Sequence, residues 1–159
     1  MTLDPSALAD ALAELFAGFP ATAAEAADGM AAAYFDYASA GVFGASTPVL
    51  TSAHKDALAA ALLAAIAVPA AGLPATIAGA WSAGVAAFWL AVPVVGPMTG
   101  ATAGCPGAAS LVASLTVIFA NLANTAESCA LSLATALHAA TLTVTATVAP
   151  PPGTVLPIA

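Results

Sequence analysis

The sequence predicts a mainly α protein, in which about five alanine-rich helices form a bundle that is followed by a single C-terminal β-strand and an extended proline-rich arm. Residues 1–140 combine alanine-rich segments with helix-capping and helix-stopping signals, which predict a helical body. Residues 141–148, TLTVTATV, instead alternate threonines with apolar side chains in strict period two, as strands do. We therefore expect the strand and its arm to occupy residues 141–159.

Residues 1–40 predict an acidic, amphipathic hairpin of two helices. Asp4 can cap the first helix and Pro5 suits its first turn, so we expect this helix to run to about Ala17. The second helix begins with the capping box TAAE and is expected to extend to about residue 40. Its large apolar side chains fall on one stripe: Met30, Tyr34 and Tyr37.

Residues 51–140 predict apolar helices. After a loop at residues 41–50, one helix is expected over residues 53–68 and another over residues 75–92, because a proline follows each segment. The second of these helices carries small residues at every fourth position, which would form a smooth strip for the close approach of another helix: Gly79, Ala83 and Ala87.

A glycine-rich connector over residues 93–107 precedes the last helix, which is expected over residues 108–140 and could carry a break. Polar side chains recur in it at spacings of three: Asn121, Asn124 and Glu127. Opposite them runs an apolar stripe, and this pattern predicts a helix with one polar face.

Charge is scarce and unevenly placed along the chain. Hydrophobic residues make up 62% of the 159, the net charge is −7, and Lys55 is the only lysine or arginine. This balance argues against nucleic-acid binding, because neutralising phosphates needs Lys and Arg. From residue 57 to residue 159 the only formal charge is Glu127. A surface made of these residues would be poorly solvated alone, so we expect it to lie in lipid or against other protein subunits.

The best membrane candidate is residues 76–95, which have the length that a bilayer needs. No lysine or arginine after Lys55 would orient a span, and much of the hydropathy comes from alanine, which favours tight helix packing equally well. Burial against protein is therefore favoured over burial of residues 57–95 in lipid. The acidic N-terminus does not have the form of a secretory signal.

No motif with catalytic or metal-binding spacing is found. The two histidines and two cysteines lack the close pairing of a zinc motif, so Cys105 and Cys129 are expected to be free, small buried residues. The glycine-rich connector is not followed by the GK[ST] of a phosphate loop. Ser46 lacks the GxSxG elbow, and pairing Asp36 with Asp56 would be arbitrary. We expect a protein that is not an enzyme and that has no cofactor and no metal.

Three segments carry a resemblance to a known class of protein: DPSALADALAELFAG at residues 4–18, PATAAEAADGMAAAYFDYASAG at 20–41, and TATVAPPPGTVLPIA at 145–159. In these segments the chain resembles the small alanine-rich structural proteins of tailed bacteriophages and of contractile tail-like particles. The resemblance is compositional and covers the two ends better than the middle. It implies an acidic helical start, alanine-rich helices and a C-terminal arm rich in Thr, Val and Pro, and it implies no catalytic residues.

A lone strand needs a partner, because its backbone N–H and C=O groups cannot stay unpaired when buried. We therefore expect the strand to pair with a neighbouring subunit and the arm to pack on it. The expected assembly residues are Leu142, Val144, Val148, Val155, Leu156 and Ile158.

The predicted function is that of a structural subunit of a phage tail or baseplate, or of a contractile tail-like injection particle. It would be assembled in the bacterial cytoplasm, with other structural subunits and copies of itself as partners. The alternative is a small, multi-span, holin-like protein of the inner membrane. A soluble module that binds apolar ligands is a third possibility.

Overall fold

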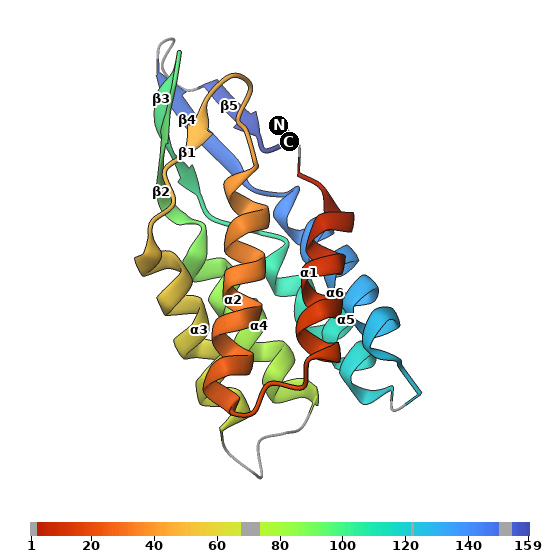
Figure 1. The fold of residues 1–159 in the computed structure, drawn as a ribbon. Helices are drawn as coiled ribbons and strands as arrows, with labels where there is room; N and C mark the ends of the chain where they lie inside the picture. Colours follow the sequence, from red (N-terminus) through yellow and green to blue (C-terminus); the bar gives the residue numbers. More distant parts are fainter. Residues whose placement is uncertain (1–2, 68–73, 122, 150–153) are drawn as a thin grey trace.

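The computed structural model describes residues 3–67, 74–121, 123–149 and 154–159. Its elements are shown in Figure 1. The helices are α1 (Pro5–Ala17), α2 (Ala23–Ser39), α3 (Ser52–Ile66), α4 (Pro74–Phe88), α5 (Ala108–Ala120) and α6 (Ala126–Thr141). The strands are β1 (Thr47–Pro48), β2 (Leu90–Val95), β3 (Thr99–Ala103), β4 (Thr145–Ala149) and β5 (Thr154–Pro157).

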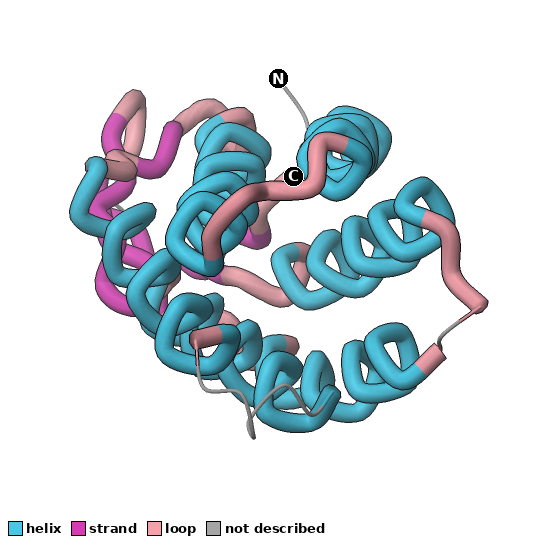
Figure 2. The backbone as a smooth tube through the Cα atoms, turned by 60° about the horizontal axis from the view of Figure 1, so that its bottom comes forward, coloured by secondary structure: helices cyan, strands magenta, loops and turns pink. Residues whose placement is uncertain are grey.

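The six helices form a closed ring. Each helix packs against the next one along the chain, and α6 packs against α1. Figure 2, which is turned so that the end remote from the sheet comes forward, shows the helices arranged around a common centre. In this ring α4 lies across from α1, and α5 lies across from α2. The ring therefore has two opposite sides, one made by the first helices of the chain and the other by α4 and α5.

The centre of the ring is filled by large aromatic side chains. Tyr34 of α2 is fully buried, and its ring contacts Phe88 at a centroid distance of 5.2 Å and Trp81 at 6.2 Å, both edge-on. Trp89, just after α4, is also fully buried and donates its Nε1–H to the Tyr34 hydroxyl at 2.9 Å. Burial of these large rings provides much of the hydrophobic stabilisation, since the many alanines bury little area each.

A curled antiparallel sheet covers the upper end of the ring, in the strand order β1-β2-β3-β4-β5 (Figure 1). The segment before β1 also bonds to the end of the chain. Phe43 forms a bridge with Ile158, and Val42 and Ala159 exchange two backbone hydrogen bonds of 3.0 and 2.9 Å. Because Phe43 also pairs with Ser46, just before β1, both edges of the curled sheet are linked through residues 42–46.

The expected bundle with a single C-terminal strand is wrong, because much of the connector over residues 93–107 belongs to a five-stranded sheet. The helix expected over residues 75–92 ends at Phe88, and β2 follows almost at once. Pro93 suggested a helix stop, yet it lies inside β2 where the register shifts and where Ala91 has a φ of +57°. A bulge of this kind tolerates a proline. The buried Thr102 hydroxyl stabilises it by accepting from the Val92 N–H (2.9 Å) and donating to the Trp89 carbonyl.

The strand and arm expected over residues 141–159 are also placed differently. Helix α6 continues through Thr141, whose hydroxyl donates to the Leu137 carbonyl at 2.8 Å, and β4 begins only at Thr145. Strand β4 pairs with β3 on one side and β5 on the other, so both of its edges are occupied within the chain. The expected arm folds back as β5, apart from residues 150–153, which lie outside the described residues.

The long helix expected over residues 108–140 is two helices. Helix α5 ends at Ala120 and α6 starts after the cap Thr125, whose hydroxyl accepts from the Ser128 N–H at 3.1 Å. The expected polar stripe contributes to the turn between them, since Asn124 Nδ2 donates to the Ile118 carbonyl at 3.0 Å. Short polar side chains that bond the backbone favour a turn over a continuous helix.

The first two helices are confirmed closely. The first runs from Pro5 to Ala17, and the Asp4 carboxylate accepts from the Ser6 N–H at 2.8 Å. The second begins with the expected capping box, in which the Thr22 hydroxyl accepts from the Glu25 N–H at 3.1 Å. Local capping chemistry was sufficient to place both ends of α1 and the start of α2.

Candidate functional site

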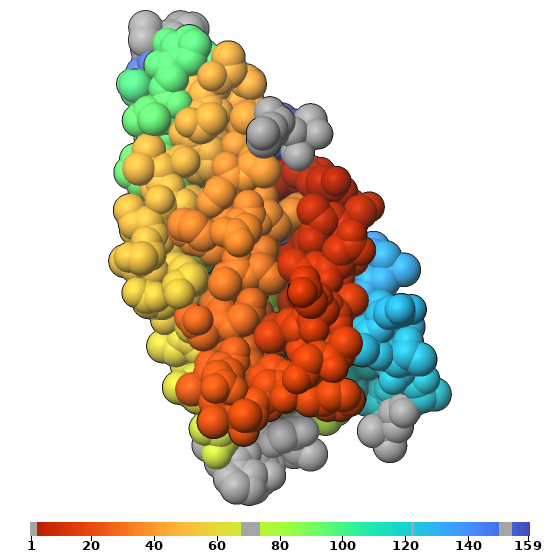
Figure 3. Space-filling model, viewed as in Figure 1, coloured from red at the N-terminus to blue at the C-terminus, as the bar shows by residue number. Residues whose placement is uncertain are grey.

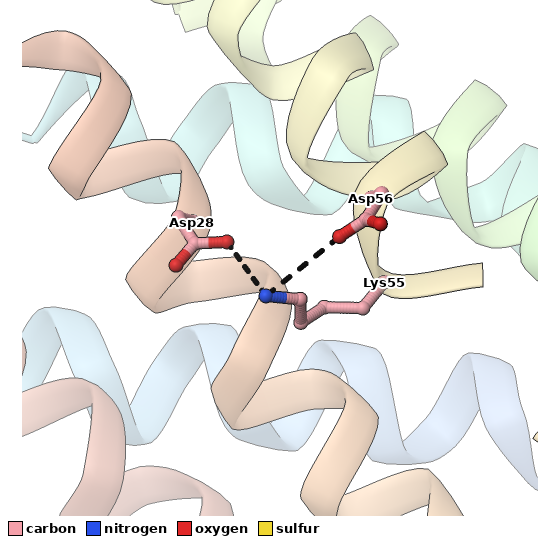
Figure 4. A network of polar contacts seen from close by, with 3 residues as sticks. All are labelled: Asp28, Lys55 and Asp56. Atoms are coloured by element: carbon pink, nitrogen blue, oxygen red, sulfur yellow. Dashed lines mark hydrogen bonds and ion pairs between the residues drawn. The ribbon is translucent and has the colours of Figure 1, made fainter. Parts of the chain in front are cut away.

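All charged side chains except that of Glu127, on α6, lie on one side of the molecule. Figure 3 shows the side formed by α1, α2 and α3, which together with the cap Asp4 carry every acidic residue except Glu127. The single cation, Lys55 of α3, lies between two carboxylates, 2.9 Å from Asp28 Oδ1 and 3.7 Å from Asp56 Oδ1 (Figure 4). These contacts raise the pKa of the Lys55 ammonium, chiefly through the hydrogen bond with Asp28. The acidic side therefore has no unpaired cation for a phosphate or a carboxylate ligand.

The opposite side has no formal charge, and we call it the charge-free surface. It consists of the exposed residues of α4, α5 and strands β2 to β5, none of which is Asp, Glu, Lys or Arg. Most are Ala, Ser, Thr and Gly, and several larger apolar residues are exposed among them: Leu90, Val95, Val112, Val117 and Val155. The strip of small residues on α4 belongs to this surface, since Ala83 and Ala87 are exposed and a Cβ added at Gly79 would meet open space.

The six assembly residues expected from the sequence do not form one exposed site. Val144, Val148 and Ile158 are buried in the core beneath the sheet, and Leu156 is half-buried against that core. Leu142 and Val155 are exposed, at 44% and 57% of their full accessibility. The alternation of residues 141–148 thus identified the buried face of β4 correctly from Val144 onward, but this face is covered by the chain itself.

A groove opens at the end of the helical ring remote from the sheet, and we call it the open-end groove. It has a volume of about 640 Å³ and is lined by residues from all six helices or their adjoining turns. Its apolar wall consists of Phe16, Phe19, Met30, Ile66, Ile77, Ile118 and Phe119. Its other described lining residues are Asn121, Asn124, Thr125, Ala126 and Cys129, so none of the described lining residues carries a charge. An apolar concavity with a few grouped polar side chains is the usual form of a ligand site.

Phe19 stands at the rim of the open-end groove in an unfavourable conformation. It is 83% exposed, and its φ of +46° places a bulky L-residue in the left-handed region. Phe19 directly follows the C-cap of α1, Gly18, and helices commonly end with a left-handed residue at this position, although usually with glycine. The exposed ring adds to the apolar character of the groove rim.

The chemically reactive side chains are not brought together. His54 bonds to Thr51 at the start of α3, whereas His138 Nδ1 lies 2.6 Å from the Tyr37 hydroxyl. Both cysteines are free, Cys105 buried and Cys129 half-buried in the groove wall. Burial raises the pKa of each thiol, which disfavours the reactive thiolate. Among the described residues, no three His, Cys, Asp or Glu side chains are grouped to hold a metal ion.

The remaining residues considered from the sequence have structural contacts. The Ser46 hydroxyl is buried, donates to the Met98 carbonyl at 2.9 Å and accepts from the Met98 N–H at 3.2 Å, which fixes the turn between β2 and β3. Asp36 is exposed on α2, far along the chain from the ion-paired Asp56. In the part of the chain that is described, no helix is both long and apolar enough to cross a membrane.

Sequence reasoning missed the open-end groove because no single segment encodes it. The groove forms where α1, α3 and α5 end and where α2, α4 and α6 begin. A usable signal was present in the last turns of the helices that end there. These solvent-facing helix ends carry large apolar residues instead of polar ones: Phe16, Ile66, Ile118 and Phe119.

Comparison of the chain with protein-family models, with curated proteins and with solved structures finds no match.

Proposed function

We propose that this protein is a structural subunit of a bacteriophage tail or baseplate, or of a contractile tail-like injection particle, and that it docks on neighbouring subunits through the charge-free surface. The observation that supports this proposal is the separation of charge between two opposite sides of one helical ring. The compositional resemblance of the two chain ends to small alanine-rich phage structural proteins supports the choice of particle.

The physical argument concerns solvation. Isolated soluble proteins keep charged residues of both signs over their surface, which limits association. Here α4, α5 and the sheet offer water only small neutral side chains and scattered larger apolar ones. Covering them with another protein removes apolar area from water at no cost in buried charge. The acidic side would remain hydrated at the outside of the assembly.

The strip of Gly79, Ala83 and Ala87 on α4 is the best candidate for the centre of this contact. Within the chain, α4 packs on α3 through a different glycine, Gly84, where an added Cβ would lie 2.5 Å from a Leu58 methyl carbon. The outward strip is therefore not used by the described intrachain packing. Small residues of this spacing let a second helix approach closely.

The proposed partners are other structural subunits and further copies of this chain, and the role is non-catalytic. Nucleic acid is not among the proposed partners, because the one cation is engaged in ion pairs. Assembly would take place in the bacterial cytoplasm. Leu142 and Val155, which are exposed, are kept as further candidate contact residues.

The test places one carboxylate on each side of the ring. Ala83→Glu would introduce a charge on the charge-free surface, and Ala24→Glu would introduce the same charge at an exposed position of α2 on the acidic side. Each tagged variant is expressed in the native host, and particles are isolated on a density gradient. We expect the Ala24→Glu protein to sediment with particles and the Ala83→Glu protein to be absent from them. Both variants should have the same Tm as the parent protein.

Three results would contradict the proposal. One is normal incorporation of Ala83→Glu, and another is a parent protein that never sediments with particles of any kind. The third is parent protein that stays in the membrane pellet after carbonate extraction, which would favour the holin-like alternative.

A further inference from the structure

We propose that the open-end groove binds one neutral, single-chain amphiphile, such as a long-chain alcohol or a monoacylglycerol. This inference goes beyond the assembly role and stands on separate residues, since the groove faces the end of the ring and not the charge-free surface. The alkyl chain would lie between the helix ends, and the polar head would lie at the turn between α5 and α6.

The size and lining of the groove suit an alkyl chain. A volume of about 640 Å³ falls within the range of sites for small molecules, which is roughly 300–1,000 Å³. Met30 and Ile77 lie four residues before Tyr34 and Trp81, so the inner wall lies one helical turn from the aromatic centre of the ring. Ile66, Ile118 and Phe119 are only half-buried, and an inserted chain would complete their burial.

The polar residues of the groove are grouped at the α5–α6 turn. Asn121 Nδ2 donates to Asn124 Oδ1, and Asn124 Nδ2 donates to the Ile118 carbonyl, each at 3.0 Å. An amide nitrogen has two N–H groups, so among the described residues each asparagine keeps one N–H beyond these bonds. A hydroxyl or ester oxygen of a neutral head would accept them. This corner is amide and hydroxyl in character, which matches a glycerol or alcohol head.

Charge decides between possible occupants. The acidic residues nearest the groove along the chain are Glu127, next to Ala126, Glu14, two residues before Phe16, and Asp28, two residues before Met30. Asp28 is paired with Lys55, so the unpaired carboxylates are those of Glu127 and Glu14. An anionic head such as a fatty-acid carboxylate would be repelled by these glutamates and would find no unpaired cation, because Lys55 is held by Asp28 and Asp56. A second copy seated end to end would bring the same glutamates together. A small neutral amphiphile avoids both costs.

Phe19 provides an independent observation at this site. Its ring stands at the groove rim, 83% exposed and on a left-handed backbone. This conformation ends α1, because Phe19 directly follows the C-cap Gly18, and it leaves the ring at the groove rim. Contact with a bound alkyl chain would remove this ring from water.

The first experiment measures binding of the neutral fluorescent probe N-phenyl-1-naphthylamine and its displacement by two amphiphiles with the same chain. Glycerol monolaurate has a neutral head and laurate has an anionic one. We expect one probe site per protein chain and displacement by glycerol monolaurate at a concentration at least about tenfold lower than that of laurate. Absence of probe binding, or equal displacement by the two amphiphiles, would overturn the proposal. So would displacement by apolar peptides alone.

A matched pair of variants locates the site. Ile118 lines the groove, whereas Val117, its neighbour on α5, is 71% exposed and faces away from it. Ile118→Asn should weaken probe binding by about tenfold or more, because it replaces aliphatic contact with a polar group. Val117→Asn should leave binding unchanged. Thermal melts establish that both variants are folded. The assignment would be refuted if both variants weakened probe binding equally, or if neither weakened it.

The Cys129 thiol gives a second readout that does not depend on the probe. In a Cys105→Ala background it is the only thiol, and it lies in the groove wall. Glycerol monolaurate should slow its reaction with a maleimide several-fold, and laurate at the same concentration should not. An unchanged rate at a saturating concentration would overturn the proposal, without bearing on the role of the charge-free surface.

Discussion

Removal of one buried hydroxyl at the centre of the ring should measurably destabilise the fold. Trp89 Nε1–H donates to the Tyr34 hydroxyl at 2.9 Å, and this hydroxyl lies 2.8 Å from Thr141 Oγ1, which itself donates to the Leu137 carbonyl at 2.8 Å. Because Thr141 has one hydrogen and gives it to Leu137, Tyr34 is the donor to Thr141. The chain of bonds therefore runs in one direction and joins α2 and α6 to the indole that follows α4.

Tyr34→Phe leaves the indole N–H of Trp89 buried without an acceptor and deprives Thr141 of a donor. An unsatisfied buried donor costs about 1–3 kcal/mol. The Thr141 hydroxyl keeps its bond to the Leu137 carbonyl, so the free energy lost at Thr141 is smaller. Deleting one oxygen atom creates little empty volume. We expect the free energy of unfolding to fall by about 2–3 kcal/mol. In a chain of this size that lowers Tm by roughly 4–10 °C.

Urea denaturation followed by tryptophan fluorescence measures this change, with calorimetry as a check on Tm. Tyr37→Phe is the control, because its hydroxyl bonds to the half-buried His138, which water can reach in its place, and interacts with Thr141 without accepting from the Trp89 indole. It should cost less than about 1 kcal/mol. In a double-mutant cycle with Thr141→Val, the two losses should fall short of additivity by about 1 kcal/mol. A Tyr34→Phe loss below about 0.5 kcal/mol, or strict additivity, would refute the reasoning.

Three further predictions concern pH, glycine positions and the sheet. Burial raises the pKa of both tyrosine hydroxyls above the ordinary value near 10 and raises the pKa of both thiols above their ordinary value. Denaturant titrations should therefore show full stability at neutral pH and a decline from about pH 9 upward, once these groups ionise in the unfolded chain. The fully buried Tyr34 should contribute up to about 1.4 kcal/mol per pH unit, and the three partly exposed groups less. Constant stability to pH 11 would contradict this. Gly79→Ala should raise the free energy of unfolding by roughly 0.5–1 kcal/mol, because its Cβ would meet open space on a helix. Gly100→Ala should lower the free energy of unfolding by at least about 2 kcal/mol, because the added Cβ would lie 2.0 Å from the Thr147 carbonyl oxygen. Equal Tm changes in the two variants would count against the packing described. Val148→Asp should prevent folding, as judged by circular dichroism, because it buries an unpaired carboxylate. Val155→Asp, at an exposed position, should leave the free energy of unfolding within about 0.5 kcal/mol of that of the parent. A folded Val148→Asp protein would show that the Val148 face of β4 is not part of the core.

The parts of the fold that were predictable from sequence are those set by local chemistry. The capping residues Asp4 and Thr22 bond their own first turns, so the start of each helix is encoded within a few residues. The strands β2 and β3 are set by distant partners. Gly100 and Ala101 favour no strand by themselves, yet both pair with β4, more than 40 residues later. Pro93 lies at a bulge in β2, and Thr102 of the neighbouring strand bonds to the backbone of this bulge at Val92.

The candidate sites follow the same division. The charge-free surface was predictable because it depends on composition, and the absence of charge between residues 57 and 126 is visible in the sequence. The open-end groove was not, because its walls come from six helices whose order around the ring is a tertiary property. The expectation of a single strand without an intrachain partner was wrong for a related reason, since β4 pairs with β3 and β5 of the same chain.

The closure of the helical ring by α1 and α6 has a consequence for how the molecule opens and closes. The contact joins segments that are more than 100 residues apart, so its loop-closure entropy must be overcome before the contact contributes. A row of helices can fray from either end, one helix at a time. A ring has no terminal helix, and detaching any member exposes the flanks of two others. Partial unfolding should therefore be rare, and backbone amides in helices at opposite ends of the sequence should exchange with solvent in a single shared event.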